Sequence, residues 1–224
     1  MKIRNGFVSN SSSSSFLIIY KCLKDFCQFD QFKCFETFYN DLKNADPSIA
    51  FNHIKGIIDT ALYRLYDCLE NFMFLDYGND VDDLLEIANV SYEEYRTIEE
   101  KVLNLGHEYQ ENVFKKYPDI RNICFNSGGN YYRFLDKEQM NFIQECEKNY
   151  RDAYYDEAFQ KELDEGIENL AMKIQDTLTE KGYQIRSIRY EDDTNKGYMM
   201  EQGFMPFLKR NPERKYEIFI TNEH

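Results

Sequence analysis

Histidine, the residue that most often binds metals and transfers protons, is scarce in this sequence: only three of the 224 residues are histidine. His53, His107 and His224 form no HExxH motif and no other spacing that directs two ring nitrogens at one ion. No Walker loop and no GxGxxG sequence is present, and Gly128–Gly129 is more typical of a tight turn than of a phosphate-binding loop. The sequence therefore predicts no metal and no cofactor, and it identifies no catalytic residue.

Cysteine pairs and long apolar runs are also missing. The six cysteines include no CxxC pair and match no zinc module, so we expect reduced, mostly buried thiols. There is no apolar run long enough to span a bilayer, and no signal-peptide-like apolar segment near the start. We therefore expect a cytoplasmic protein that has no membrane partner.

What the sequence does have is material for a core. Hydrophobic residues make up 42% of the chain, and the 18 tyrosines and 18 phenylalanines set it apart from disordered chains. A chain of this length can bury most of the surface that it exposes when unfolded. We expect a single domain over residues 1–224, with the alternative that residues from about 46 to 118 form a helical lobe of their own.

Hydrophobic periodicity predicts both helices and strands. Phe16–Tyr20 is a short continuous apolar run, typical of a central strand buried on both faces. Apolar spacings of three and four predict helices at about 30–42, 47–72, 81–88, 91–116, 140–150 and 155–178. Further strands are predicted at 183–190 and 215–221, with a β-hairpin around Asn126–Asn130. The expected fold class is α+β, with a mostly antiparallel sheet of about four to five strands covered by several amphipathic helices.

Acidic residues exceed basic residues by 40 to 27, and the resulting formal charge of −13 repels phosphate backbones. We therefore expect no direct binding to nucleic acid. Two segments concentrate the acid: Asp76–Glu100 holds nine carboxylates and one base, and Arg151–Glu168 holds seven carboxylates and two bases. These segments are either solvated helix faces or a surface that docks on a basic protein. The candidate partner-binding carboxylates are Asp80, Asp82, Asp83, Glu93, Glu94, Asp156, Glu157, Glu162, Asp164 and Glu165.

The segment between the last two predicted strands carries more apolar mass than a solvated loop should. It runs from about residue 191 to 215, which is too long for an ordinary connection in a compact domain. Either it packs on the sheet or forms a short helix, or its methionines make an adaptable surface that binds a partner. The candidate residues for partner binding are Met199, Met200, Phe204 and Met205.

A run of serines stands directly before the first apolar segment. It is a polar loop, or a turn whose hydroxyl and N–H groups bind an anion or a protein, or an address or modification site read by another molecule. The string GFVSNSSSSSF, preceded by MKIR, resembles the start of many uncharacterised proteins of bacteriophages and their hosts. The resemblance covers under a tenth of the chain and implies a phage or prophage origin, with no catalytic residue to transfer. Its positions are Gly6, Phe7, Asn10, Ser11, Ser12, Ser13, Ser14, Ser15 and Phe16.

These observations lead to one main hypothesis and two alternatives. The main hypothesis is a non-enzymatic phage-type accessory protein that binds, and inhibits or redirects, a host protein with a basic surface, such as a CRISPR or other nucleic-acid-handling complex. The first alternative is an enzyme with an unfamiliar site, in which the serine run lies near the hairpin residues Asn126–Tyr132 and Arg133. The second alternative is a virion or assembly component.

Overall fold

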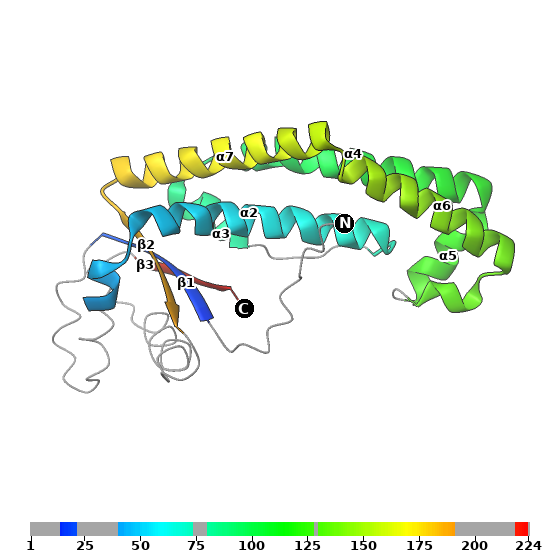
Figure 1. The fold of residues 1–224 in the computed structure, drawn as a ribbon, viewed down its shortest axis with the longest axis horizontal. Coiled ribbons are helices and arrows are strands. Elements are labelled where there is room, and N and C mark those ends of the chain that lie inside the picture. The colour runs from blue at the N-terminus through cyan, green and yellow to red at the C-terminus, as the bar shows by residue number, and fades with distance from the viewer. Residues whose placement is uncertain (1–13, 22–39, 74–79, 128–129, 191–217, 224) are drawn as a thin grey trace. The chain divides into compact units, whose positions relative to one another are not determined.

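The computed structural model describes residues 14–21, 40–73, 80–127, 130–190 and 218–223 (Figure 1). The chain divides into two compact units: a sheet unit, residues 1–54 and 175–224, and a helical unit, residues 55–174. The expectation of one domain with a lobe at about 46–118 stays a prediction. The expected helix at about 30–42 lies mostly outside the described residues, which show its last part as helical residues 40–44.

The sheet unit contains an antiparallel sheet with the order β2-β1-β3. Its strands are β1 (Ser14–Tyr20), β2 (Gln184–Tyr190) and β3 (Ile218–Glu223). Leu17 of β1 pairs with Ser187 on one side and with Thr221 on the other. The predicted central position of the first apolar run is confirmed, since residues 16–19 of β1 are fully buried. A continuous apolar run suits such a strand because it has neighbours on both edges and cover on both faces.

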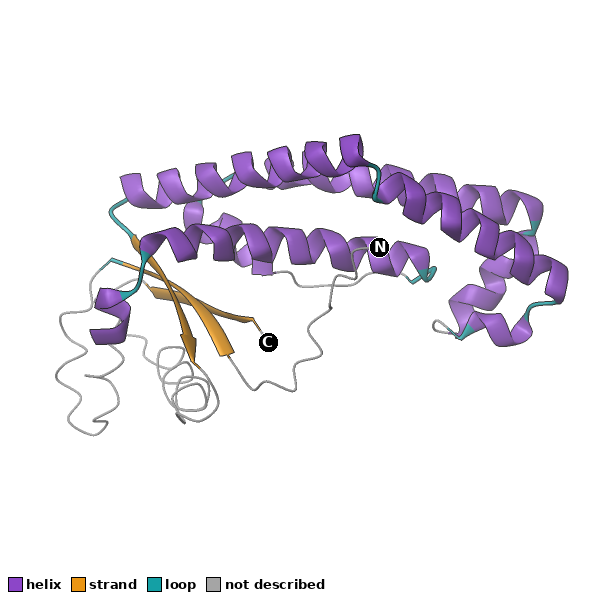
Figure 2. Ribbon diagram, viewed as in Figure 1, coloured by secondary structure: helices purple, strands orange, loops and turns teal. Residues whose placement is uncertain are grey.

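The expected fold class is wrong. The described residues are mostly helical, and the sheet among them has three strands where four to five were expected. The predicted hairpin is also wrong, because that segment forms helix α5 (Pro118–Ser127) and the 3₁₀ helix η2 (Tyr131–Phe134) (Figure 2). Pro118 supplies a fixed φ at the first helical position, and Asp119 places a carboxylate in the first turn. Ile120 and Cys124 are both buried at a helical spacing of four.

Four predicted long helices and the predicted short helix at 81–88 are confirmed. They are α2 (Pro47–Glu70), α3 (Asp80–Ala88), α4 (Tyr92–Lys116), α6 (Lys137–Tyr154) and α7 (Glu157–Glu180). Polar side chains cap their first turns: Asp46 Oδ1 accepts a hydrogen bond from Ser48 N at 2.9 Å, and Asp136 forms a capping box with Gln139. Ser91 caps α4, and its hydroxyl accepts a hydrogen bond from Glu93 N.

Side-chain contacts show how the helices of the helical unit pack. α4 and α7 are antiparallel, since Glu94 near the start of α4 pairs with Lys173 of α7, and Lys101 pairs with Glu162 at 2.5 Å. The end of α2 runs antiparallel to α6, because Tyr66 stacks on Tyr154 and Glu70, one turn later in α2, pairs with Arg151, which precedes Tyr154 in α6. The unit is therefore a helical bundle in which α4 packs on α6 and α7.

α4 comes unusually close to α2 at Gly106. A Cβ atom at this position would lie 2.5 Å from Leu69 Cδ1 and 2.8 Å from Leu69 Cβ, well inside van der Waals contact. Gln110, one turn later, donates a hydrogen bond to the Leu69 carbonyl at 3.1 Å. Glycine weakens a helix interior, so the close approach to α2 explains its presence here.

We expect Gly106→Ala to lower the free energy of unfolding by up to about 2 kcal/mol. The overpacking cost of about 1–3 kcal/mol against Leu69 exceeds the gain of about 1 kcal/mol in helix propensity. Urea unfolding of the variant measures the difference. Asn104→Ala, at an exposed position of the same helix, is the matched control and should be neutral or slightly stabilising. A Gly106→Ala protein more stable than the wild type would contradict the close packing.

Candidate functional site

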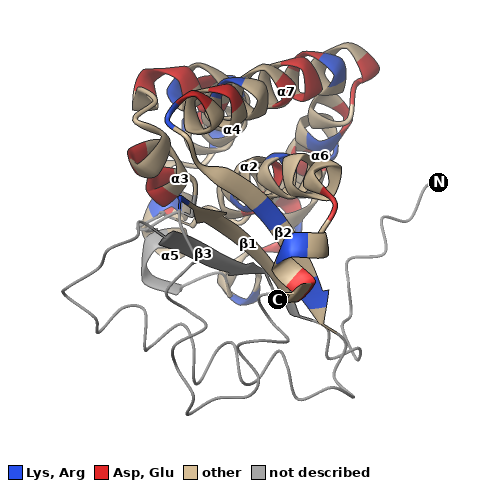
Figure 3. Ribbon diagram, turned by 90° about the vertical axis from the view of Figure 1, so that its left-hand side faces the viewer, with Lys and Arg blue, Asp and Glu red and all other residues tan. Residues whose placement is uncertain are grey.

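The excess of negative charge is confined to the helical unit. Residues 55–174 hold 26 of the 40 acidic and 13 of the 27 basic side chains, which gives this unit a charge of −13. The sheet unit has the remaining 14 acidic and 14 basic side chains and therefore a formal charge of zero. Any role of the charge in binding thus belongs to the helical unit, where the red acidic positions mark α3 and α7 in Figure 3.

Several of the predicted partner-binding carboxylates stabilise the bundle instead of standing free. Glu94 pairs with Lys173 and Glu162 pairs with Lys101, so both join α4 to α7. Within single helices, Glu93 lies 3.6 Å from Arg96, and Glu165 lies 3.7 Å from Lys161. Asp156 caps α7 by accepting hydrogen bonds from Ala158 N and Phe159 N. These residues have structural partners that the sequence pattern did not reveal.

Other predicted carboxylates make no ion pair with another described residue. Asp82 and Asp83 are exposed on α3, and Glu157 and Asp164 are exposed on α7. Asp80 is the first residue of α3, and its side chain lies outside the described part. Each of these four exposed carboxylates keeps its charge available to a partner.

The densest group of such carboxylates lies where α3 meets the start of α4. Asp82, Asp83 and the exposed Glu86 share one side of α3, at spacings of one and four residues. On α4, Tyr92 is 45% exposed and donates a hydrogen bond to Glu99 Oε2 at 3.1 Å. We call these five residues the acidic patch.

The electrostatics of the acidic patch reflect crowded negative charge. Burial raises the pKa of Glu99, and the charge of Asp82 raises it further, so the two carboxylates are near enough to repel each other. Burial and the charge of Glu99 raise the pKa of Tyr92 to about 12. A cation placed on the patch would relieve this repulsion, which favours binding of a basic group.

Some predicted site residues lie outside the described part of the chain. They are Met199, Met200, Phe204 and Met205 of the long connection, and Gly6, Phe7, Asn10, Ser11, Ser12 and Ser13 of the N-terminal motif. The motif's last residues, Ser14, Ser15 and Phe16, begin β1. The serine run and the segment Asn126–Arg133, which the enzyme hypothesis brings together, belong to different units.

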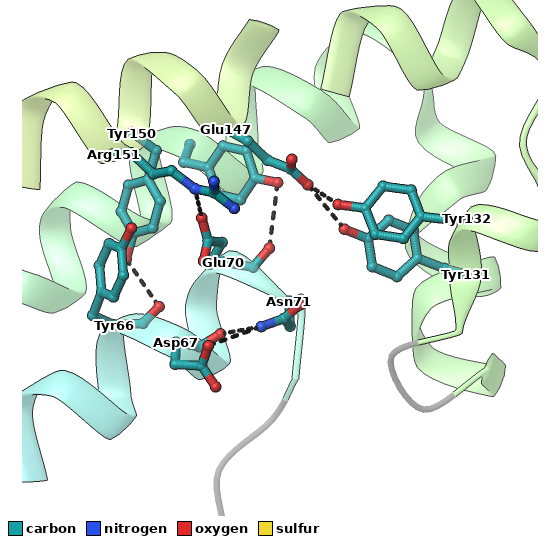
Figure 4. A network of polar contacts seen from close by, with 10 residues as sticks. Tyr66, Asp67, Glu70, Asn71, Tyr131, Tyr132, Glu147, Tyr150 and Arg151 are labelled. Atoms are coloured by element: carbon teal, nitrogen blue, oxygen red, sulfur yellow. Dashed lines mark hydrogen bonds and ion pairs between the residues drawn. The ribbon is translucent and has the colours of Figure 1, made fainter. Parts of the chain in front are cut away.

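A tyrosine-rich network at one end of the bundle was not anticipated from the sequence. Glu147 of α6 is only 8% exposed and accepts hydrogen bonds from the hydroxyls of Tyr131, at 3.3 Å, and Tyr132 (Figure 4). Tyr109 donates to the Glu70 carbonyl at 3.4 Å, and the Glu70 carboxylate pairs with Arg151. Glu147 occupies the buried stripe of α6 between Ile143 and Tyr150, and a carboxylate on an apolar stripe was the signal available in the sequence.

The tyrosine rings of this network stack on one another. The centroid distances are 4.9 Å for Tyr66 and Tyr150, 5.0 Å for Tyr109 and Tyr150, and 4.2 Å for Tyr131 and Tyr132. Burial raises the pKa of each of these hydroxyls, that of Tyr132 to about 12 with a further contribution from its hydrogen bond to Glu147. The hydroxyls therefore stay protonated at neutral pH. Those that donate hydrogen bonds between α2, α4, η2 and α6 belong to Tyr109, Tyr131, Tyr132 and Tyr150.

The sheet unit contains a hydrogen-bonded histidine and serine. His53 Nδ1 lies 2.8 Å from Ser187 Oγ, and the two residues are 8% and 9% exposed. A serine beside a histidine has the composition of a nucleophile with its base, but a nucleophile must also reach a substrate. Burial of both side chains in the sheet unit favours a role in the core. The same burial lowers the pKa of His53 to about 4, so the ring is neutral at pH 7.

No family model matches the chain, and searches of curated proteins and of solved structures also found no match. Within the residues described, no group of three or more His, Cys, Asp or Glu side chains is arranged to hold a metal ion. None of the helices in the described ranges combines the length and apolarity needed to cross a lipid bilayer. The acidic patch is the candidate site because its α3 carboxylates are exposed, carry no ion pair with a described residue, and lie close to one another.

We expect Glu147→Leu to lower the free energy of unfolding by about 2 kcal/mol, because it leaves the buried Tyr131 hydroxyl without its acceptor. Adding Tyr131→Phe and Tyr132→Phe should recover part of this loss, since the stranded hydroxyls are then absent. Urea unfolding of the variants gives the comparison. Lys148→Leu, at the exposed neighbouring position, is the control. Equal stability of Glu147→Leu and the wild type would show that the network does not hold the bundle together.

We expect acid to destabilise the sheet unit through His53. The unfolded chain binds a proton at a pKa near 6.5, whereas the folded chain does so only near pH 4, so stability falls as the pH drops from about 6.5 to about 4. His53→Gln should remove about 2 kcal/mol of the difference in unfolding free energy between pH 7 and pH 4.5. The exposed His107→Gln is the control and should keep the full difference. An unchanged difference in His53→Gln would refute the assignment.

Proposed function

We propose that the chain is a phage-type accessory protein whose helical unit binds a host protein through the acidic patch. The observation that carries the proposal is the confinement of the whole net charge of −13 to residues 55–174. A protein that only needed charge for solubility could carry it on both units. The phage-like start of the chain supports the same setting, and a cytoplasmic location in the host cell is part of the proposal.

The patch has properties that suit a protein partner. Its three α3 carboxylates make no ion pair with a described residue, so their binding to a cation breaks no ion pair made by those residues. Tyr92 adds an exposed aromatic ring, a side chain that often anchors protein interfaces. The ion pairs between α4 and α7 and the close approach at Gly106 hold α4 in place, which reduces the ordering cost of binding.

The partner that best fits is a protein whose own basic surface serves nucleic acid. Such a surface carries exposed Lys and Arg that a field of carboxylates attracts over a distance, which speeds association at low salt. Occupation by the acidic patch would exclude the phosphate backbone from that surface. The proposed consequence is inhibition or redirection of a nucleic-acid-handling host complex, such as a CRISPR effector.

We expect the purified chain to capture a host protein whose binding weakens as salt is raised. The variant Asp82→Asn, Asp83→Asn, Glu86→Gln should bind that protein about tenfold more weakly, since each exposed ion pair contributes about 0.5 kcal/mol. The captured protein should also lose its own binding to duplex DNA or RNA when the wild-type chain is added.

The matched control is Glu108→Gln, Glu111→Gln, Asp152→Asn, which removes the same charge from exposed positions outside the patch. Equal affinity of the two triple variants would show that net charge, and not the patch, attracts the partner. Tight binding of the chain itself to duplex DNA at physiological salt would contradict the proposal outright.

A further inference from the structure

The far end of the helical unit presents a basic and aromatic surface. Phe134 of η2 is 66% exposed, the largest value among the bulky apolar side chains described. Arg133 precedes it, and Lys137 begins α6 three residues later. Lys116, the last residue of α4, joins this end because its Nζ lies 3.9 Å from the centroid of the Phe142 ring in α6. We call Lys116, Arg133, Phe134 and Lys137 the basic tip.

The part of the chain around the basic tip differs in net charge from the rest of the helical unit. Residues 111–139 hold five basic and four acidic side chains, whereas the remainder of the helical unit holds eight basic and 22 acidic side chains. Lys116 is partly explained as a favourable charge at the end of α4. Arg133 and Phe134 are both exposed, and Arg133 makes no ion pair with a described residue.

The acidic patch and the basic tip lie at opposite ends of one rigid helix. α4 has 25 residues and begins with Tyr92 of the patch and ends with Lys116 of the tip. At 1.5 Å per residue these ends are about 36 Å apart. One copy of the helical unit therefore cannot pair its own patch with its own tip, but two copies can.

We propose that the basic tip docks on the acidic patch of a second copy of this chain. Arg133 and Lys137 meet the carboxylates of Asp82, Asp83 and Glu86, and Phe134 packs beside Tyr92. The contact is head-to-tail, so each added copy leaves one tip and one patch exposed, and association continues beyond a dimer unless a ring closes. This inference goes beyond the proposed function and does not depend on it.

Charge complementarity favours a second copy over nucleic acid as the occupant of the tip. The tip has three bases, and a phosphate backbone that extends beyond them meets the remainder of the helical unit, with its 22 acidic side chains. The second copy supplies carboxylates in a compact group and an exposed aromatic ring opposite Phe134. Its binding also relieves the repulsion between Asp82 and Glu99.

Sedimentation velocity of the full chain over a wide range of concentration tests the proposal. The average mass should rise with concentration beyond that of a dimer at low salt and return toward the monomer at high salt. Arg133→Glu, Lys137→Glu should stay monomeric, and so should Asp82→Lys, Asp83→Lys. Mixing these two variants should restore association beyond a dimer, because the native patch of one meets the native tip of the other and the reversed tip meets the reversed patch. Phe134→Ser should weaken the association of the otherwise native chain.

Lys148→Glu, at an exposed position of α6 outside both surfaces, is the control and should associate like the wild type. A chain that stays monomeric at every concentration, association that survives both charge reversals, or a mixture of the two variants that stays monomeric would each overturn the proposal. So would a mass increase that needs added duplex DNA. The Arg133→Glu, Lys137→Glu variant leaves the acidic patch intact. It should therefore still capture a basic host protein if the proposed function holds, even when it no longer self-associates.

Discussion

The stacking of tyrosines where α2, α4 and α6 meet is the constraint on which the helical unit depends. Tyr66, Tyr109 and Tyr150 come one from each helix, and their rings stack at about the spacing of van der Waals contact. The Tyr150 hydroxyl donates to the Tyr66 carbonyl, and the Tyr109 hydroxyl donates to the Glu70 carbonyl. A layer of aliphatic side chains would tolerate small slides between helices, whereas rings with fixed acceptors specify one register.

The charged residues of the helical unit divide into those that hold helices together and those that do not. Glu94 and Glu162 reach lysines on the facing helix, whereas Asp82 and Asp83 reach no cation among the described residues. Exposed ion pairs contribute little to stability, and unpaired like charges oppose folding. Asp82 and Asp83 lie in the first turn of α3, where the helix dipole favours carboxylates, so part of the excess acid on α3 has a structural role.

The sequence predicts the helices and strands whose apolar pattern is clear within their own residues. It fails where a short apolar run fits both a helix and a strand, and where contacts join residues far apart in the chain. The apolar stripes of α2 and α4 span many turns, and the run at Phe16–Tyr20 is too short and too apolar for an exposed helix, so each is recognised from its own residues. The hairpin prediction for segment 121–134 is wrong because a short apolar run fits a helix turn and a strand equally, and because the residues that start the helix, Pro118 and Asp119, precede that run. The pairing of Tyr131 with Glu147, and the ion pairs between residues 61 to 81 positions apart, depend on tertiary packing that no local pattern contains.

The neutral sheet unit gives the charge distribution a directional consequence. A molecule whose charge sits in one part has a dipole moment, so the field of a cationic partner exerts a torque on it as well as an attraction. That torque acts within about a Debye length of the partner, about 8 Å at physiological ionic strength, and so turns the molecule before the surfaces touch. Collisions then occur mostly through residues 55–174, while the sheet unit feels no comparable pull and remains available for contacts of another chemistry.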